Sequence, residues 1–316
     1  MSGTPSIGAP SAGPDPLRVT VVVLNWNGWP DTVPCLESCL RASYPGLRLL
    51  LVDNGSTDGS EAILRERFPS VELLQTGKNL GFAGGNNAGI RRALADGADL
   101  VLLLNNDTEV DPGFVTELVD AAVAHPDAGM LCPKILLHDR PDVLWYAGAF
   151  FHPWLGWGGH RGYGEPDRGQ FDRLEETPRP TGCALLVTQA LCDRIGLLRE
   201  DYFCYVEDLE WGLRAREAGF SILYVPRSRI WHRVSRSTGG AQSVTAARYS
   251  TRNMLACVDE RLPLPAPARP LRWAAIVAAG VLGVLKNRLP LGAGLAAIAR
   301  GAADRLRGRS GPIPFP

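Results

Sequence analysis

The chain has 316 residues, of which 45% are apolar, so it can bury a sizeable core. Its formal net charge is zero, but residues 266–316 contain eight basic residues and one acidic residue, which leaves −7 on the rest of the chain. An acidic body argues against nucleic acid as a partner, and a basic, apolar segment favours an anionic membrane surface. Seven cysteines without a Cys-x-x-Cys pair, most of them in apolar runs, indicate reduced thiols and a cytoplasmic protein.

Strand-like and helix-like segments alternate along most of the chain. Short aliphatic or β-branched runs predict strands at 18–25, 47–53, 71–75, 99–104, 181–189 and 220–225, and helical spacing predicts helices at 29–42, 61–68, 112–125, 208–218 and 246–258. The glycine-rich residues 77–85 are expected to form a loop before a helix that ends near Asp96. This alternation predicts an α/β protein with a mainly parallel central sheet and right-handed crossovers.

The two ends of the chain differ from this body in composition. Residues 1–17 are rich in Ser, Gly and Pro and lack a basic start and an apolar stretch, which predicts a disordered leader and no signal peptide. We expect one domain at 18–261, a proline-rich linker at 262–270 and a basic amphipathic helical tail at 271–316. The apolar run 273–285 is shorter than the roughly 20 residues that span a bilayer, so residues 271–309 are expected to lie in the membrane interface or to pack back on the core.

Residues 144–164 interrupt the alternating pattern. They are rich in aromatic residues and glycine and show no period, which predicts a long functional loop or hairpin. Two interpretations of Trp154, Trp157 and Tyr163 are open: they stack on or cover a bound substrate, or they only pin the loop to the sheet. His152 and His160 are read as loop residues without an assigned role.

Polar side chains follow several predicted strands at the point where each strand ends. The buried run 100–104 leads into Asn105, Asn106 and Asp107, and Asn25 with Asn27 and Asp53 with Asn54 follow two earlier strands. Because ligands of open α/β sheets bind outside the carboxyl ends of the strands, we expect these groups to converge on one crevice. The local alternatives are an Asx turn at Asp53, a helix cap at Asp107 and a plain acidic helix start at Glu207 and Asp208.

Absent motifs exclude two classes of nucleotide-binding protein. The first strand leads into NWNGW, which is neither a Gly-x-Gly-x-x-Gly fingerprint nor a Walker loop, so a dinucleotide oxidoreductase and a P-loop ATPase are excluded. Asp53 is suited to accept a hydrogen bond from a base or a ribose hydroxyl. The segment KNLGFAGGNNAG, residues 78–89, allows close backbone approach, and the helix start after it favours anions.

Several of these segments resemble one known family. VVLNWNGW, VDNGSTDGS, NLGFAGGNNAG, LLLNNDTEV, TGCALLV, FCYVEDLEWGLRAREAGF and IWHR stand in the order found in family 2 glycosyltransferases of the GT-A fold, and the sequence looks most like the bacterial rhamnosyltransferase-type enzymes of that family. The resemblance covers residues 19–238 and excludes the tail. It implies a GT-A nucleotide-diphospho-sugar transferase fold with a C-terminal helical appendage.

The resemblance also implies roles for individual residues. Asp53 matches the aspartate that contacts the nucleotide base, and Asn105 and Asp107 occupy the outer positions of the Asp-x-Asp motif, which binds a divalent cation, Mg²⁺ or Mn²⁺, and the donor diphosphate. Asp208 matches the catalytic base, with Glu207 beside it. His232 matches a histidine near the metal or phosphate, and a purely structural histidine is the alternative. Asn105 departs from the family aspartate, which puts the strength of the metal site in doubt.

The full set of expected site residues has four parts. Donor binding is assigned to Asn25, Asn27, Asp53, Asn54, Lys78, Asn79, Gly84, Asn105 and Asn106, catalysis to Asp208 and Glu207, metal binding to Asp107 and His232, and the acceptor site to Thr181, Gly182 and Trp211.

These features predict an inverting, metal-dependent glycosyltransferase that uses a dTDP- or UDP-sugar, with dTDP-L-rhamnose as one candidate donor. The expected acceptor is a hydroxyl of a cell-wall, polysaccharide or lipid-linked glycan at the inner face of the cell membrane. The alternatives are glycosylation of a specialised metabolite, a sugar nucleotidyltransferase and an inactive glycan-binding relic. A nucleotidyltransferase needs a glycine-rich loop with a basic residue after the first strand, which NWNGWPD does not supply, and a relic does not need Asp208.

Overall fold

The first half of the molecule is a parallel α/β unit. The structure is a computed structural model that describes residues 15–234 and 243–313. Its first elements are β1 (Val19–Asn25), α1 (Trp29–Cys39), β2 (Leu47–Asp53), α2 (Ser60–Arg67), β3 (Glu72–Gln75), α3 (Gly81–Ala95) and β4 (Leu100–Asn105). Strand β1 pairs in parallel with β2 and β4, and β2 pairs in parallel with β3. The aliphatic runs of β1 and β4 are buried, as expected for strands covered by helices on both faces.

The second half extends this sheet with strands of both directions. Its elements are β5 (Thr108–Val110), α4 (Phe114–Ala124), β6 (Ala128–Leu137), β7 (Arg140–Tyr146), β8 (Ala149–His152), β9 (Trp157–His160), β10 (Glu175–Glu176), β11 (Ala184–Thr188), α5 (Gln189–Ile195), α6 (Glu207–Glu217) and β12 (Ser221–His232). The strand order is β10-β12-β6-β11-β4-β1-β2-β3, with β11 antiparallel to both neighbours. Strands β8 and β9 form a separate antiparallel hairpin, so residues 144–164 adopt the hairpin alternative.

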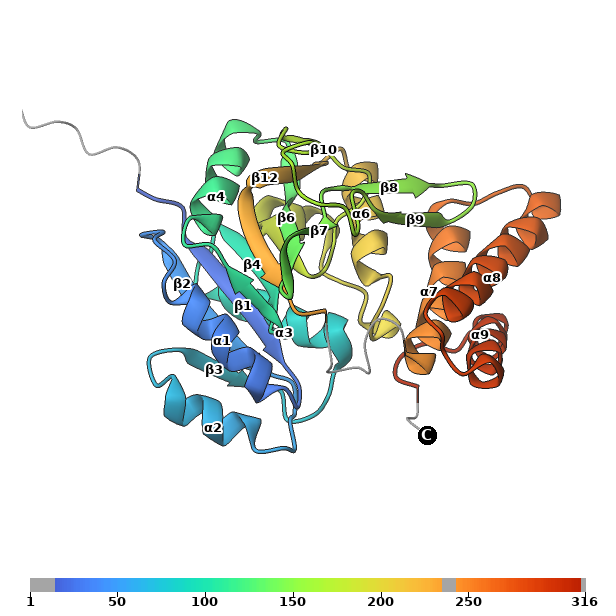
Figure 1. Ribbon diagram of the computed structural model, residues 1–316, viewed down its shortest axis with the longest axis horizontal. Helices are drawn as coiled ribbons and strands as arrows, with labels where there is room; N and C mark the ends of the chain where they lie inside the picture. The colour runs from blue at the N-terminus through green and yellow to red at the C-terminus, as the bar shows by residue number, and fades with distance from the viewer. Residues whose placement is uncertain (1–14, 235–242, 314–316) are drawn as a thin grey trace, which may run out of the picture.

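Three helices pack together beside the sheet. Figure 1 shows α7 (Val244–Arg261), α8 (Arg269–Lys286) and α9 (Leu291–Leu306) as one helical unit, toward which the β8–β9 hairpin reaches. Leu255 and Val258 of α7 and Ile276 of α8 form its small core. Helix α8 begins within the expected linker, and a short 3₁₀ turn, Ala266–Ala268, precedes it. We call α7, α8 and α9 the C-terminal helical unit.

The apolar segment of the C-terminal helical unit is longer than the sequence predicted. Among the described residues, the helical segment Ala266–Lys286 is long and apolar enough to cross a membrane by length and composition, with a mean hydropathy of 1.4. The estimate from residues 273–285 alone was too short because the helix continues at both ends. Only 17% of the apolar window is buried inside the protein.

The glycine-rich segment also differs from its prediction. Helix α3 begins at Gly81, inside the loop expected at 77–85. Its glycines serve helix packing, since a Cβ at Gly89 would lie 2.3 Å from Cγ1 of Val22 and one at Gly85 would lie 2.6 Å from Cδ1 of Leu24. The missing side chains therefore let α3 lie close on β1, which a sequence reading of this segment as a ligand loop did not anticipate.

Two further boundaries differ from expectation. Strand β12 continues through His232 instead of ending at residue 225, because its second half pairs with β5 and β6. The expected disordered leader falls mostly outside the described residues. Its last residue, Leu17, packs against the core, and its carbonyl accepts a hydrogen bond from the Tyr44 hydroxyl at 2.8 Å.

Candidate active site

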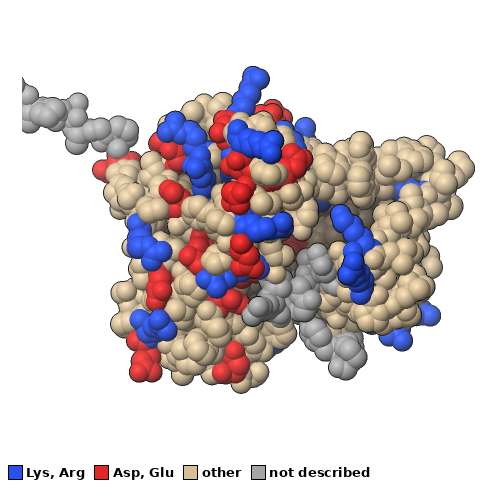
Figure 2. All heavy atoms as spheres, viewed as in Figure 1, with Lys and Arg blue, Asp and Glu red and all other residues tan. Residues whose placement is uncertain are grey.

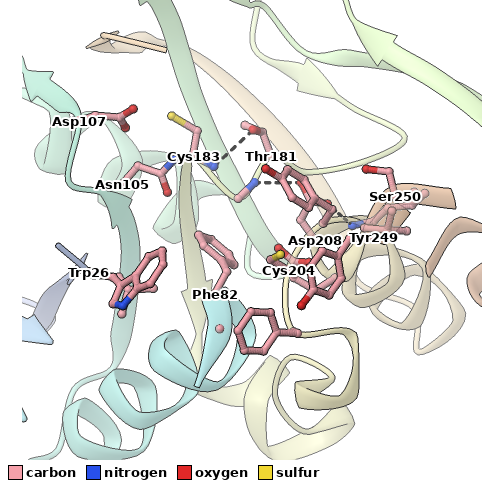
Figure 3. A pocket seen from close by; sticks show the side chains of 18 of the residues that line it. Trp26, Phe82, Asn105, Asp107, Thr181, Cys183, Cys204, Asp208, Tyr249 and Ser250 are labelled. Atoms are coloured by element: carbon pink, nitrogen blue, oxygen red, sulfur yellow. Dashed lines mark hydrogen bonds between the residues drawn. The ribbon is translucent and has the colours of Figure 1, made fainter. Parts of the chain in front are cut away.

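A pocket of 480 Å³ lies at the carboxyl ends of the central strands. Asn54 after β2 and Asn105, Asn106 and Asp107 after β4 line it, as the clustering of polar strand ends predicted. Figure 3 shows Asn105 and Asp107 on one side of the pocket and Asp208, Tyr249 and Ser250 on the other. The pocket therefore has two opposed polar walls, which we call the donor wall and the acceptor wall. Its surface between them is largely apolar and includes Phe82.

The donor wall brings a carboxylate and an imidazole together. Oδ1 of Asp107 lies 3.1 Å from Nε2 of His232, and each side chain is 6% exposed. The backbone holds this pair, because the N–H of Arg233 donates to the carbonyl of Asp107 at 2.9 Å. The ring of Trp145 packs edge-on against His232, with ring centroids 4.6 Å apart.

The donor atoms of this pair, a carboxylate oxygen and an imidazole nitrogen, are suited to bind a divalent cation. Among the described residues, no group of three or more His, Cys, Asp or Glu side chains could hold a metal ion. A cation bound at Asp107 and His232 would therefore need oxygen atoms of a ligand or of water to complete its coordination.

Asp53 and Asn25 lie behind the donor wall. Asp53 is fully buried, and its carboxylate accepts hydrogen bonds from Nδ2 of Asn25, the N–H of Ser56 and Nε2 of Gln75, each at 2.9 Å. The bond from Ser56 is the local turn contact that the sequence left open as an alternative for Asp53. Neither Asp53 nor Asn25 lines the pocket, so their contact with a nucleotide stays a prediction.

Asn54 fixes the segment that enters α3. Its Nδ2 donates to Oδ1 of Asn79 at 3.2 Å and to the carbonyl of Gly81 at 3.0 Å, and its Oδ1 accepts from the N–H of Leu80 at 3.0 Å. These bonds place Asn79, Gly81 and Phe82 in the pocket wall.

Three other expected donor residues lie outside the pocket. Lys78 and Asn27 are exposed, and Gly84 packs against Leu80 within α3. Asn106 lines the pocket and donates from Nδ2 to the hydroxyl of Thr32 at 2.8 Å.

The acceptor wall holds the carboxylate of Asp208. One oxygen accepts a hydrogen bond from the N–H of Gly182 at 3.0 Å, and the other accepts from the N–H of Leu209 at 2.7 Å. Nη2 of Arg179 lies 3.8 Å from the same carboxylate. Thr181 and Gly182 both line the pocket, so the two strand-entry residues expected at the acceptor lie beside Asp208.

Glu207, beside Asp208, has a strongly shifted pKa. Burial, and after it the neighbouring Asp208, raises the pKa of Glu207 to about 8. Its Oε2 is buried and has no hydrogen-bond partner among the described residues. At neutral pH Glu207 therefore carries a proton.

The segment before Glu207 has a strained backbone. Phe203, Tyr205 and Val206 have φ values of 65°, 68° and 75°, in the left-handed region that side chains with a Cβ rarely adopt. The amide of Asn253 on α7 holds this segment, because Nδ2 donates to the carbonyls of Tyr202, Cys204 and Tyr205 at 3.0, 2.9 and 2.8 Å. Arg252 adds a bond to the carbonyl of Tyr202 at 3.0 Å. A helix outside the sheet therefore positions the catalytic candidates.

Other pocket residues escaped the sequence analysis. Trp145, His160, Arg179, Tyr249 and Ser250 all line the pocket. Burial lowers the pKa of His160 to about 3, so its ring is neutral and packs between Trp145 and Tyr146. The aromatic stretch 144–164 was a signal for Trp145 and His160, but nothing in it separated them from Trp154 and Trp157, which lie outside the pocket.

Trp211 is wrong as an acceptor residue. It is fully buried in the main core, and its Nε1 donates to the carbonyl of Gly196 at 2.9 Å. It occupies the face of α6 that packs on the sheet, whereas Asp208 on the same helix reaches the pocket. The motif that contains both residues did not reveal this difference in direction.

Comparisons with known proteins agree with this geometry. The family described as "Glycosyl transferase family 2" matches residues 20–195. The chain is 35% identical over 239 residues to the N-acetylglucosaminyl-diphospho-decaprenol L-rhamnosyltransferase of Mycobacterium tuberculosis, which covers 69% of this chain and 77% of the relative.

Two solved structures share the fold over nearly the whole chain. The mannosyltransferase PcManGT from Pyrobaculum calidifontis, in complex with GDP-Man and Mn²⁺, has a TM-score of 0.57 at 19% identity and covers 92% of this chain and 87% of that one. S. aureus TarS residues 1–349, in complex with UDP-GlcNAc, has a TM-score of 0.54 at 13% identity and covers 93% of each chain. This likeness confirms the expected GT-A type of fold. The chain therefore belongs to glycosyl transferase family 2 and is a glycosyltransferase that moves a sugar from a nucleotide sugar.

Proposed function

We propose that this enzyme transfers a rhamnosyl group, with inversion, from dTDP-L-rhamnose to a hydroxyl of an N-acetylglucosaminyl diphosphate lipid. The opposition of Asp107 and His232 to Asp208 across one pocket carries the proposal, because a metal-diphosphate site and a base must face each other across the sugar. The relative from M. tuberculosis supports the sugar and the acceptor class through its name and its 35% identity. A UDP-sugar is the second candidate donor.

The donor wall would hold the diphosphate and a divalent cation. Asp107 and His232 would be the protein ligands, and a bound cation would neutralise the negative charge that develops on the departing diphosphate. Mg²⁺ prefers oxygen ligands, whereas an imidazole ligand is typical of transition metals, so we favour Mn²⁺. With asparagine at position 105, Asp107 supplies the single carboxylate of the motif's two outer positions.

The acceptor wall would supply the base. Asp208 would take the proton of the acceptor hydroxyl while that oxygen bonds to the anomeric carbon, and the bond from this carbon to the diphosphate would break on the opposite side. The bonding electrons leave with the nucleotide diphosphate, and the anomeric configuration inverts. The N–H of Gly182 fixes one oxygen of the Asp208 carboxylate, whereas Glu207, whose pKa burial raises to about 8, holds its own proton at neutral pH.

The location of the reaction follows from the thiols and from the acceptor. All seven cysteines are free and six are buried, which suits the reducing cytoplasm. With a lipid-linked acceptor, we expect the enzyme to act at the inner face of the cell membrane. The hydroxyls of Thr181 and Ser250 in the pocket are suited to bind the acceptor sugar.

A transfer assay with defined substrates tests this function. The purified chain is incubated with dTDP-L-rhamnose, UDP-GlcNAc or GDP-mannose and a short-chain N-acetylglucosaminyl diphosphate lipid, with Mn²⁺ or with EDTA. We expect Mn²⁺-dependent transfer from dTDP-L-rhamnose and an inverted anomeric centre by NMR. Donor binding without transfer to any glycan would favour the inactive relic, and transfer only to a small aglycone would favour a specialised metabolite.

A further inference from the structure

The C-terminal helical unit has an exposed apolar face. On α8 the exposed residues fall at one helical spacing, Leu271, Ala274, Ala278, Leu282 and Leu285, and on α9 they include Leu291, Leu295 and Leu306. The spacing of three and four residues places the α8 set on one side of the helix. Figure 2 shows this part of the molecule as mostly uncharged, in contrast to the mixed charges over the sheet.

The tip of the β8–β9 hairpin extends the same surface. Trp154 and Trp157 are 48% and 47% exposed, and neither lines the pocket. Arg272 at the start of α8 joins the tip to the helices, because its side chain, although only 3% exposed, donates to the carbonyls of Trp154 at 2.9 Å and Val258 at 3.2 Å. A Cβ at Gly156 would lie 2.7 Å from Cγ1 of Val258, so the hairpin sits directly on α7. Two segments far apart in the sequence therefore form one apolar surface.

The unpaired charges on α8 and α9 are all positive among the described residues. Asp259, Glu260 and Asp304 pair with several of the nearby arginines. Lys286, Arg288, Arg300 and Arg307 are exposed and have no carboxylate within ion-pair distance among the described residues. The single acidic residue of 266–313, Asp304, is buried. The described surface of α8 and α9 thus combines leucines with unpaired cations and presents no anion.

We infer that the hairpin tip, α8 and α9 form a docking surface for an anionic lipid bilayer. Exposed leucine and tryptophan side chains partition into the headgroup boundary, and lysine and arginine beside them bind anionic headgroups. A symmetric contact with a second copy would bring the unpaired cations of both copies together. An anionic bilayer would instead attract them. Helix α8 lies on the membrane and does not span it, since Arg272, Ile276 and Val284 pack it onto α7 and α9.

This arrangement gives the pocket a defined orientation, an inference that rests on the proposed lipid-linked acceptor. Helix α7 supports the docking surface through Val258 and also lines the acceptor wall through Tyr249 and Ser250. Docking would therefore present the acceptor wall, not the donor wall, to a substrate held in the bilayer.

Vesicle binding of the full chain tests the docking surface without any sugar nucleotide. The wild type is sedimented with vesicles of phosphatidylcholine alone or with 30% phosphatidylglycerol. Two double variants, Trp154→Ser with Trp157→Ser and Leu282→Gln with Leu285→Gln, remove exposed side chains that no core contact requires. Leu40→Gln with Val123→Gln is the matched control, because both residues are exposed hydrophobics on the sheet domain.

We expect the wild type to bind anionic vesicles and each double variant to lose about tenfold in partitioning, while the control binds as the wild type does. The fold of each variant is checked by its thermal transition. Equal binding of all variants, or wild-type binding only to neutral vesicles, would overturn the inference. Wild-type protein that stays with the vesicles after a wash in alkaline carbonate would show that α8 spans the bilayer, against the inference. If the wild type is a dimer in solution and a double variant is a monomer that still binds vesicles, the surface is a protein interface and the inference is wrong. Failure of the transfer assay leaves this result unaffected, so the two proposals are separable.

Discussion

The two walls of the pocket are built in different ways. The donor wall consists of residues at or just after the carboxyl ends of strands, and its contacts stay within the sheet and its connecting segments, as with Asn54 and Asp107. The acceptor wall depends on a strained segment, residues 203–206, which Asn253 holds from α7. Strained backbone of this kind costs on the order of 1–3 kcal/mol per residue and persists only where surrounding contacts impose it. Strand order therefore positions the donor wall, whereas packing between segments far apart in the chain positions Asp208.

The largest expected effect is on the acceptor wall, at Asp208. Asp208→Asn keeps the hydrogen bond from Gly182 but cannot take a proton, so kcat should fall about 1,000-fold while the dissociation constant of the donor stays unchanged. Steady-state kinetics and calorimetric titration with dTDP measure the two quantities. Asp193→Asn, on the exposed face of α5, is the control. A kcat near that of the wild type would remove Asp208 from the role of base.

The donor wall should respond to metal instead. Asp107→Asn removes the carboxylate beside His232, and we expect about a 100-fold loss of kcat/KM together with a weaker dependence on Mn²⁺. Titration of activity with Mn²⁺, and of dTDP binding with and without Mn²⁺, measures this. Unchanged metal dependence would show that the cation does not bind at Asp107.

Asn253 tests whether the acceptor wall is positioned from outside. Asn253→Ala leaves the carbonyls of Cys204 and Tyr205 without this donor, whereas Tyr202 keeps its bond from Arg252, so kcat should fall about tenfold while donor affinity stays the same. Asn87→Ala is the matched control, because Asn87 is equally buried and bonds the carbonyl and the N–H of Leu198, away from the pocket. Both variants lose stability, but only the first should lose turnover. Equal kcat values for the two would contradict a positioning role.

The smallest expected effect concerns the protonation of Glu207. Its pKa is raised to about 8 in the folded protein, above the value near 4.5 in the unfolded chain, so the folded state binds the extra proton between these pH values. This contribution is fully present at low pH and declines by at most about 1.4 kcal/mol per pH unit as pH rises toward 8. Glu207→Gln lacks this titration. Its free energy of unfolding relative to that of the wild type, measured with denaturant, should therefore increase as pH rises from 5 to 8. A constant difference would show that Glu207 is ionised.

Local patterns predicted β1 to β4, β11, the first half of β12 and most helices, because alternation of aliphatic runs with helical spacing reports burial directly, but they missed β6 and β7. They also predicted the meeting of Asn54, Asn105 and Asp107, since parallel strands end at one edge. They failed at α3, whose glycines serve packing on β1, and at Trp211, which shares a motif with Asp208 but lies in the core. In both cases the role of the residue depended on which face of its helix it occupies, and the residue type alone did not reveal that face.

The sequence by itself determined the family, the α/β sheet and the segments that carry the polar strand ends, because these depend on contacts and periodicities within short stretches of chain. Tertiary structure alone decided that Arg179, His160 and Tyr249 join the pocket, that Asn253 holds the segment before Glu207, and that the hairpin tip adjoins α8. These contacts join residues far apart in the chain, and no local pattern encodes which distant side chain fills a given space.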